Sequence, residues 1–375
     1  MQLTTWLLVS AGAFSVVSST PVEKRAPPKT FSLQFDVVPA RNSRKRDELV
    51  PLGKDDFSWQ YQTMVHLGSN KQKITVALDT GSSDLWVPAQ GVTCQRAGCD
   101  SDGTFDPTSS STFHRTGTSF ALTYGDGTSS RGYYGKDDYW FSDGTKLPQF
   151  QFGIATQVST SNGLFGIGKQ AGEAAKPQYP NFPYALKNAG IVDVAGYSLY
   201  LNRQQANTGN IVFGGVDTAK YSGNLTVMDI ANYQWLGATL SSIKSTNGQK
   251  ISINKPVSFD SGTTYLILEQ DLANTIFSAL GLDGNGQIAC SDISDDQTAD
   301  FTFGGSVTIS VPYSDLFDSY DGVTCFARIY TSRLGSFFGD TFLRSAYVAF
   351  NLESNKLGLA QSKYTADSKI VNFWF

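Results

Sequence analysis

The stretch that decides the fold is Val76-Ala77-Leu78-Asp79-Thr80-Gly81-Ser82-Ser83, and it has a counterpart far downstream, Val257-Ser258-Phe259-Asp260-Ser261-Gly262-Thr263-Thr264. In each copy an apolar run typical of a β-strand ends at an aspartate. A hydroxyl residue, a glycine and two more hydroxyl residues follow the aspartate. The glycine permits a tight turn and the close approach of another backbone, and the hydroxyl groups can donate hydrogen bonds to the carboxylate.

One such element alone is an ordinary strand end with an Asx-type turn. Two copies in a single chain indicate two similar lobes. Each lobe would contribute one aspartate, Asp79 or Asp260, to a shared site.

The composition favours an all-β protein. The 375 residues are enough for two domains with real cores. Charged residues make up only 17%, and the chain has 36 glycines and abundant tyrosine, phenylalanine, threonine and serine. The formal net charge is -4, and residues 1–46 contain seven basic but only two acidic residues, so the rest of the chain is more acidic. An acidic body is a poor partner for nucleic acid or an anionic membrane, and we expect neither.

The cysteines and histidines argue against a metal site. Four cysteines are present, at positions Cys94, Cys99, Cys290 and Cys325. The sequence alone permits three disulfide pairings, and four free thiols are the alternative. No zinc site is expected, because the first two cysteines have no second ligand pair nearby and the chain has only two histidines, His66 and His114. No cofactor is expected either.

The paired motifs, Asp79-Thr80-Gly81 and Asp260-Ser261-Gly262, resemble those of the pepsin family of aspartic proteases, and within it the secreted yeast proteases of the candidapepsin type. The resemblance extends from about Phe57 to about Lys363. It implies an all-β, bilobal fold of two pseudo-twofold-related, β-barrel-like lobes with a few short helices and a β-hairpin flap. It also implies local disulfides, Cys94 with Cys99 and Cys290 with Cys325.

The same resemblance assigns the residues of the site. Asp79 and Asp260 would be catalytic. The flap is expected at 119–128, where alternating residues lead into Tyr124 and a Gly-Asp-Gly turn follows. Trp86 would support the flap tyrosine. The residues expected to contact substrate are Gly81, Ser82, Tyr124, Gly125, Asp126, Leu164, Gly262, Thr263 and Thr264.

The first 46 residues are predicted to be processing segments. Residues 1–18 are predicted to be a signal peptide, because their apolar run precedes small serines and is too short for a membrane anchor. Residues 19–46 are predicted to be a propeptide, removed at the dibasic pair Lys45-Arg46 by a processing convertase. Its positive charge could cover two carboxylates, whereas a solvated basic tail is the alternative. The N-terminal lobe would span 47–221 and the C-terminal lobe 222–375.

Further sequence features predict two helices, a glycosylation site and the location of the mature protein. Apolar residues on one face predict a helix at 269–282 with Gly281 near its end, and Pro183 can start a short helix through Lys187. Asn224 is the asparagine of one glycosylation sequon. We expect a secreted, extracellular monomer.

These features predict an aspartic endopeptidase that hydrolyses peptide bonds in acid. Two aspartates at close range share one proton. The ionised oxygen would activate a water, and the protonated one would bind the peptide carbonyl. The expected substrates are proteins and peptides with large hydrophobic residues around the cut. The expected inhibitors are statine-type peptides, whose hydroxyl mimics the tetrahedral diol.

Three other functions fit the sequence less well. A catalytically silent peptide-binding or inhibitor protein on the same fold would usually have lost an aspartate or altered the flap, yet Asp79, Asp260 and Tyr124 are all present. A glycosidase also uses two carboxylates, but it does not explain the duplicated motif. A Ser-His-Asp hydrolase requires a nucleophile motif such as Gly-x-Ser-x-Gly, which is not visible.

Overall fold

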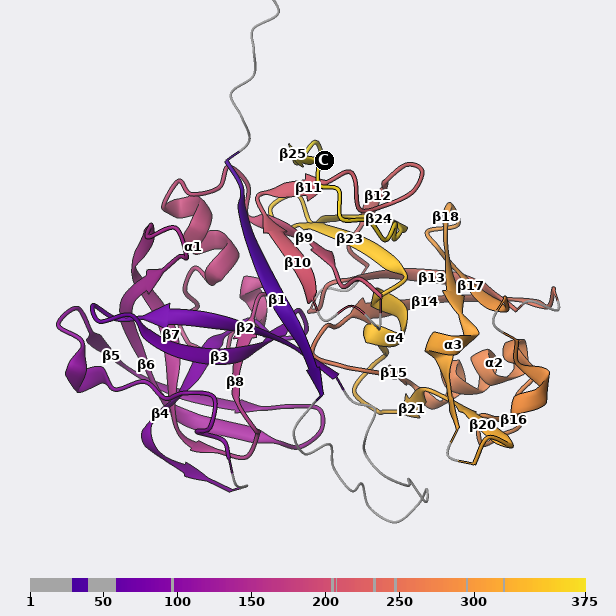
Figure 1. Ribbon diagram of the computed structural model, residues 1–375, viewed down its shortest axis with the longest axis horizontal. Helices are drawn as coiled ribbons and strands as arrows, with labels where there is room; N and C mark the ends of the chain where they lie inside the picture. Colours follow the sequence, from indigo (N-terminus) through magenta and orange to yellow (C-terminus); the bar gives the residue numbers. More distant parts are fainter. Residues whose placement is uncertain are drawn as a thin grey trace, which may run out of the picture.

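The computed structural model describes residues 29–39, 59–95, 98–203, 206, 208–231, 234–245, 248–294, 296–319 and 321–375. Strands dominate these residues (Figure 1). In the first part of the chain they are β1 Phe31–Pro39, β2 Trp59–Leu67, β3 Gln72–Asp79, β4 Leu85–Cys94, β5 His114–Thr123, β6 Ser129–Trp140, β7 Lys146–Val158, β8 Gly163–Gly166, β9 Gly196–Tyr200, β10 Thr208–Phe213 and β11 Gly215–Asp217. In the second part they are β12 Thr226–Asp229, β13 Gly237–Lys244, β14 Lys250–Phe259, β15 Leu266–Leu268, β16 Gln287–Ala289, β17 Thr298–Phe303, β18 Val307–Pro312, β19 Phe317–Ser319, β20 Thr324–Ala327, β21 Ile329–Thr331, β22 Phe337–Phe338, β23 Ala346–Asn351, β24 Lys356–Gln361 and β25 Ile370–Asn372.

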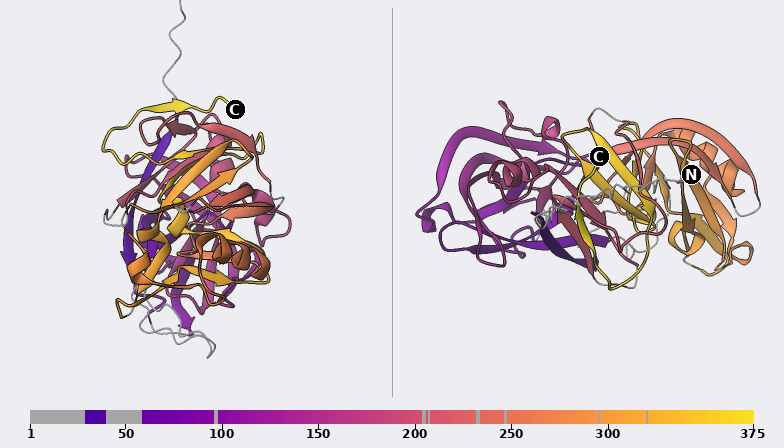
Figure 2. Two further views of the ribbon diagram at one scale, coloured as in Figure 1. Left: turned by 90° about the vertical axis from the view of Figure 1, so that its right-hand side faces the viewer. Right: turned by 90° about the horizontal axis from the view of Figure 1, so that it is seen from above.

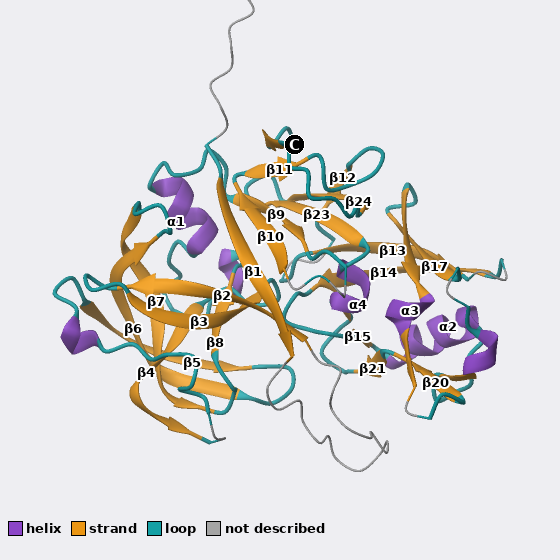
Figure 3. Cartoon of the chain, in the orientation of Figure 1, coloured by secondary structure: helices purple, strands orange, loops and turns teal. Residues whose placement is uncertain are grey.

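The helices of the described residues are short and lie outside the sheets (Figure 3). They are α1 Phe182–Asn188, α2 Gln270–Leu280, α3 Tyr313–Leu316 and α4 Asp340–Leu343, with 3-10 turns at Pro107–Ser109, Gln170–Gly172 and Cys290–Asp292. Helices α1 and α2 confirm the two helices predicted from the sequence. Gly281 follows α2 in the left-handed conformation, with φ of 73°, where a side chain would be strained.

The molecule has two lobes joined by a shared sheet (Figure 2). Thirteen strands form this sheet in the order β12-β24-β23-β9-β10-β1-β2-β3-β8-β4-β7-β6-β5. The C-terminal strands β12, β23 and β24 therefore belong to the same sheet as β2 to β8. A seven-stranded sheet, β18-β17-β13-β14-β22-β15-β21, builds the second lobe. The predicted all-β, two-lobed fold is confirmed.

The same local strand arrangement occurs in both lobes: a short strand crosses between two others, parallel to the first and antiparallel to the second. In the first, β8 runs parallel to β3 and antiparallel to β4. In the second, β22 runs parallel to β14 and antiparallel to β15. The last residue of β8, Gly166, and the residue after β22, Gly339, have no room for a side chain: a Cβ on Gly166 would lie 2.6 Å from the Asp84 nitrogen, and one on Gly339 would lie 2.1 Å from the Thr263 carbonyl oxygen. The two crossings fix the chain at the ends of β3 and β14, where the two motif aspartates lie.

Strand β1 falls inside the predicted propeptide and is nevertheless part of the shared sheet. It pairs antiparallel with β10 on one side and with β2 on the other. Its apolar residues alternate, and two of them, Phe35 and Val37, are buried. The predicted signal peptide and the processing pair Lys45-Arg46 lie outside the described residues.

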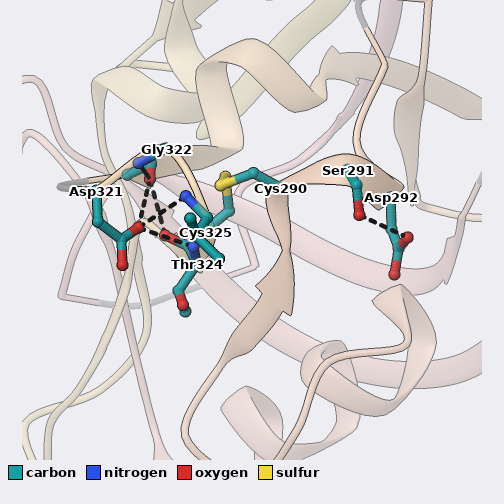
Figure 4. The surroundings of a disulfide bond; sticks show 9 residues. Cys290, Ser291, Asp292, Asp321, Gly322, Thr324 and Cys325 are labelled. Atoms are coloured by element: carbon teal, nitrogen blue, oxygen red, sulfur yellow. Dashed lines mark hydrogen bonds between the residues drawn. A yellow bond between two sulfur atoms is a disulfide. The ribbon is translucent and has the colours of Figure 1, made fainter.

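Both predicted disulfides are present. Cys94 and Cys99 are joined in the first lobe, with a Cα–Cα distance of 5.7 Å, and Cys290 and Cys325 in the second, with 5.0 Å. The second bridge links the 3-10 turn after β16 to β20, beside a turn capped by Asp321 (Figure 4). Asn224 of the sequon is exposed. None of the described helices is long and apolar enough to cross a bilayer.

Candidate active site

Two aspartates meet between the lobes. Asp79 is the last residue of β3, and Asp260 directly follows β14. Their carboxyl groups are close enough to interact directly, since a Cβ added two residues after either aspartate would lie 2.6 Å from the carboxyl oxygen of the other. Asp79 is only 5% exposed, although both aspartates lie at loop ends. The structure therefore brings together the two residues that the repeated motif predicted to share a site.

Each carboxylate is held by the same two donors of its own loop. Asp79 Oδ1 accepts a hydrogen bond from the Gly81 N–H at 2.8 Å, and Asp79 Oδ2 accepts one from the Ser82 hydroxyl. Asp260 Oδ1 accepts from the Gly262 N–H at 2.9 Å, and Oδ2 from the Thr263 hydroxyl at 2.7 Å. The donors fix the plane of each carboxylate, so the site has local twofold symmetry.

The glycines of the two motifs leave no space for a side chain. A Cβ on Gly81 would lie 2.6 Å from Asp260 Oδ1, and a Cβ on Gly262 would lie 2.6 Å from Asp79 Oδ1. Each glycine thus allows the aspartate of the opposite lobe to approach. This is the close backbone approach that the sequence suggested.

The first hydroxyl residue of each motif crosses to the other lobe. The Thr80 N–H donates to Ser261 Oγ at 3.1 Å, and the Ser261 N–H donates to Thr80 Oγ1 at 2.9 Å. The two hydroxyls in turn donate to the carbonyls of Phe259, at 2.9 Å, and Leu78, at 3.2 Å. Sequence reasoning did not single out this pair and expected the hydroxyls to serve the carboxylates. The available signal was that both occupy the same position in the two copies.

The electrostatics of the pair favour a bound proton. Burial raises the pKa of Asp79 from its ordinary value to about 7, and the charge of Asp260 adds to this effect. The hydrogen bonds from Ser82 and Gly81 act in the opposite direction, because they stabilise the ionised form. Because the carboxylates interact directly, the proton belongs to the pair.

The predicted flap is a hairpin of β5 and β6, and its Tyr124 is close enough to Asp79 to interact with the charge of that carboxyl group. Tyr124 N–H donates to the Thr128 carbonyl at 2.8 Å and closes the turn. The Tyr124 hydroxyl accepts a hydrogen bond from Trp86 Nε1 at 2.7 Å. Burial and the charge of Asp79 raise the pKa of Tyr124 well above its ordinary value, so its hydroxyl stays protonated. A Cβ on Gly125 would lie 3.4 Å from Leu334 Cδ1, so the flap tip reaches the second lobe.

The other predicted contact residues have varied surroundings. Leu164, in β8, is partly buried and is paired in register with Trp86 of β4. Asp126 lies in the flap turn, where its side chain accepts bonds from the N–H and hydroxyl of Thr128 at 2.8 and 2.6 Å. Thr264 is engaged through its carbonyl, which accepts from Thr341 Oγ1 at 3.0 Å. The positions are thus established, whereas the substrate-binding roles stay predictions.

The described residues contain no group of three or more histidine, cysteine, aspartate or glutamate side chains suited to hold a metal ion. The chemistry that the arrangement can perform is proton transfer, with one carboxylate as base and its partner as acid.

Two carboxylates in contact on matched loops, under a hairpin with a supported tyrosine, define an aspartic protease. The family model of eukaryotic aspartyl proteases matches residues 60–362. The chain belongs to this family and is an aspartic-type endopeptidase.

Individual relatives cover nearly the whole chain. The chain is 37% identical over 385 aligned residues to Candidapepsin-3 of Candida albicans (strain WO-1), covering 95% of this chain and 96% of that protein. It is 38% identical to Candidapepsin-1 of the same strain over 380 residues, with the same coverage. Secreted aspartic protease 8 of Candida albicans is 39% identical over 319 residues, 83% of this chain and 78% of that protein. The predicted resemblance to candidapepsins is confirmed.

Proposed function

We propose that this endopeptidase is secreted, is made as a zymogen, and cleaves peptide bonds in acid with a water activated between Asp79 and Asp260. The observation that carries the proposal is the direct contact of the two carboxylates, each held by a backbone N–H and a hydroxyl of its own loop.

The geometry supports a general acid–base mechanism. With one proton on the pair, the ionised oxygen removes a proton from the water while the protonated oxygen donates to the peptide carbonyl. The water attacks the carbonyl carbon and a tetrahedral diol forms. The pair then gives its proton to the nitrogen and takes one from a diol hydroxyl as the carbon–nitrogen bond breaks, so that it again holds one proton. The Ser82 and Thr263 hydroxyls hold the outer oxygens in place during these steps. Gly81 and Gly262 leave space for the substrate backbone.

Substitution of either aspartate tests the assignment. Asp79→Asn and Asp260→Asn each remove one carboxyl of the pair, and each is expected to lower cleavage of denatured haemoglobin by about 10²–10⁴-fold while circular dichroism shows a folded protein. The exposed Asp100 gives the matched control, Asp100→Asn, which is expected to cleave normally. Substantial turnover by either dyad variant would refute the assignment.

Acid activity follows from the proton on the pair. Since burial and mutual repulsion keep one proton bound until about pH 7, the reactive state is present in acid and is lost as the pH rises. A statine-type peptide, whose hydroxyl mimics the diol, is expected to inhibit strongly in the same pH range. Peptide-library cleavage would test the expected preference for large hydrophobic residues around the cut.

The zymogen proposal draws support from strand β1. Residues 31–39 belong to the predicted propeptide, and they form ladders with both β2 and β10. A propeptide folded into the enzyme in this way would leave only after the chain is cut at Lys45-Arg46 and its strand is released from β2 and β10. The double variant Lys45→Ala/Arg46→Ala is expected to accumulate as a larger, latent protein. Full activity of this variant at the normal mature size would contradict the proposal.

The names of the relatives support secretion, since several are called secreted aspartic proteases. Secretion into an oxidising compartment also suits the two disulfides. Occupancy of Asn224 can be read from a mass shift on deglycosylation, and the monomeric state from sedimentation.

A further inference from the structure

A second pair of buried acids lies next to β6, one of the two strands of the flap hairpin. Asp84, just before β4, is 1% exposed, and Glu173, in the loop after the 3-10 turn 170–172, is 3% exposed. Asp84 Oδ2 accepts a hydrogen bond from the N–H of Ala174, the neighbour of Glu173, at 2.9 Å. The two carboxyl groups interact electrostatically. The catalytic mechanism uses neither of them.

The two acids accept unequal numbers of hydrogen bonds from the surrounding protein groups. Asp84 Oδ1 accepts from the hydroxyls of Tyr134, at 2.7 Å, and Tyr179, at 2.9 Å, in addition to the Ala174 N–H at Oδ2. Glu173 Oε2 accepts from the Tyr179 N–H at 2.7 Å, whereas Oε1 is buried without a hydrogen-bond partner among the described residues. Three donors can sustain a carboxylate at Asp84, but one donor leaves an ionised Glu173 poorly compensated.

The pair is bonded to one strand of the flap hairpin and is connected to the other through Tyr134. Tyr134, which donates to Asp84, belongs to β6, and its ring lies 5.3 Å from that of Phe120 in β5. Tyr134 also packs on Tyr179 with ring centroids 5.7 Å apart. Phe120 in turn lies 6.1 Å from Trp86, which holds the flap tyrosine. A continuous aromatic cluster therefore connects the Glu173 loop with the base of the flap.

We propose that Glu173 is a positioning residue for the flap: its protonated carboxyl holds the 173–179 loop against Asp84, and loss of this proton releases the support beneath Tyr124. The inference deepens the proposed function, because it concerns the same flap. In acid the loop, Tyr179 and Tyr134 stay packed. Once Glu173 ionises, two interacting negative charges are buried at positions only 1% and 3% exposed, and the loop must move to hydrate them.

The charges around Glu173 agree with this order of titration. Burial raises the pKa of Glu173 to about 8, and the charge of Asp84 adds to the effect, whereas the Tyr179 N–H and the exposed Lys176 lower it. Burial also raises the pKa of Asp84, against which the Ala174 N–H and the two tyrosine hydroxyls act. Burial raises the pKa values of Tyr134 and Tyr179, so both remain donors.

The raised pKa of Glu173 makes the folded protein less stable as the pH rises. An ordinary glutamate, as in the unfolded chain, releases its proton near pH 4.5, whereas the folded protein keeps it to about pH 8. Folding is therefore weakened as the pH rises through this window. Between pH 5 and 8 the unfolding equilibrium constant is expected to increase by up to about 400-fold through this one group.

The first experiment observes the proton itself. The sequence has five glutamates, so selective carboxyl ¹³C labelling of glutamate gives a resolvable set of resonances. The Asp79→Asn variant is used because it cannot digest itself. One resonance, absent from Asp79→Asn/Glu173→Gln, is expected to titrate well above pH 6. Titration of every glutamate below pH 6 would overturn the proposal, whether or not the protein is a protease. If the double variant does not fold, the proposal is still tested by whether any glutamate resonance of Asp79→Asn itself titrates above pH 6.

The second experiment tests the link to the flap. Wild type, Glu173→Gln and the exposed control Glu269→Gln are held at pH 8, returned to acid, and assayed against their own untreated samples. Glu173→Gln cannot ionise and is expected to lose activity at least about tenfold more slowly than wild type, while Glu269→Gln follows wild type. Equal rates for all three proteins would overturn the positioning role.

Discussion

Thr80→Val removes one hydroxyl from the contact between the lobes and keeps the shape of the side chain. Thr80 Oγ1 accepts from the Ser261 N–H and donates to the Phe259 carbonyl, both at 2.9 Å and both buried. The valine methyl can make neither bond, so two buried backbone groups lose their partner.

The expected loss in the free energy of unfolding follows from those two unpaired backbone groups. A buried polar group left without a hydrogen bond costs about 1–3 kcal/mol. With partial relaxation we expect Thr80→Val to lower the free energy of unfolding by about 2–4 kcal/mol. Ser261→Ala is expected to have a similar effect, since its hydroxyl serves the Thr80 N–H and the Leu78 carbonyl. Because both loops carry an aspartate, catalysis should fall as well, by about tenfold or more in kcat/KM.

Urea unfolding in the Asp79→Asn background avoids self-digestion and gives the stability change, while kcat/KM is measured on the catalytically intact chain. Thr308→Val provides the control, because Thr308 is exposed and its hydroxyl is hydrogen-bonded, within the described part of the chain, to Thr302 at 3.0 Å. This control should stay within about 0.5 kcal/mol of the parent. If Thr80→Val unfolds at the same urea concentration as the control, the hydrogen bonds between Thr80 and Ser261 do not hold the two lobes together.

Three further outcomes are expected. Gly81→Ala should abolish peptide cleavage, because its Cβ would lie 2.6 Å from Asp260 Oδ1; normal kcat/KM would contradict the packing. The contribution of Asp79 to the free energy of unfolding should fall by at most about 4 kcal/mol between about pH 4 and about pH 7, in addition to the fall from Glu173, since the folded protein keeps a proton on Asp79 that the unfolded chain has released. Urea titrations of Asp79→Asn should show a flatter profile. Trp86→Phe removes the donor at 2.7 Å from the Tyr124 hydroxyl and should lower kcat/KM about fivefold, as steady-state peptide hydrolysis would reveal.

The sequence predicted the parts of the structure that repeat or that have a clear period. The duplicated motif located Asp79 and Asp260 because one strand end, with its hydroxyl and glycine, recurs in both lobes. The apolar face of α2 and the glycine turn of the flap were equally local signals. A local sequence pattern is sufficient to predict a feature when the residues that cause the feature are close neighbours in the chain.

Long-range partners were not predictable in the same way. Nothing near Thr80 indicates that its hydroxyl bonds the other lobe instead of a carboxylate. Asp84 and Glu173 are brought together only by the fold, so their separate sequences carry no sign of a buried pair. Strand β1 was a different omission, because Phe31, Leu33, Phe35 and Val37 alternate as strand residues do, and the basic charge around them directed attention to processing.

The interior place of β1 affects what a cut after Arg46 would accomplish. Hydrolysis of one peptide bond there would leave both hydrogen-bonded ladders of this strand intact, so the severed piece would stay attached as a ligand of its own enzyme. Its departure would expose the edges of β2 and β10, whose unpaired backbone groups must find a replacement strand or water. Maturation would then comprise two separable events, scission and strand exchange, and the slower of them would set how quickly fresh enzyme appears.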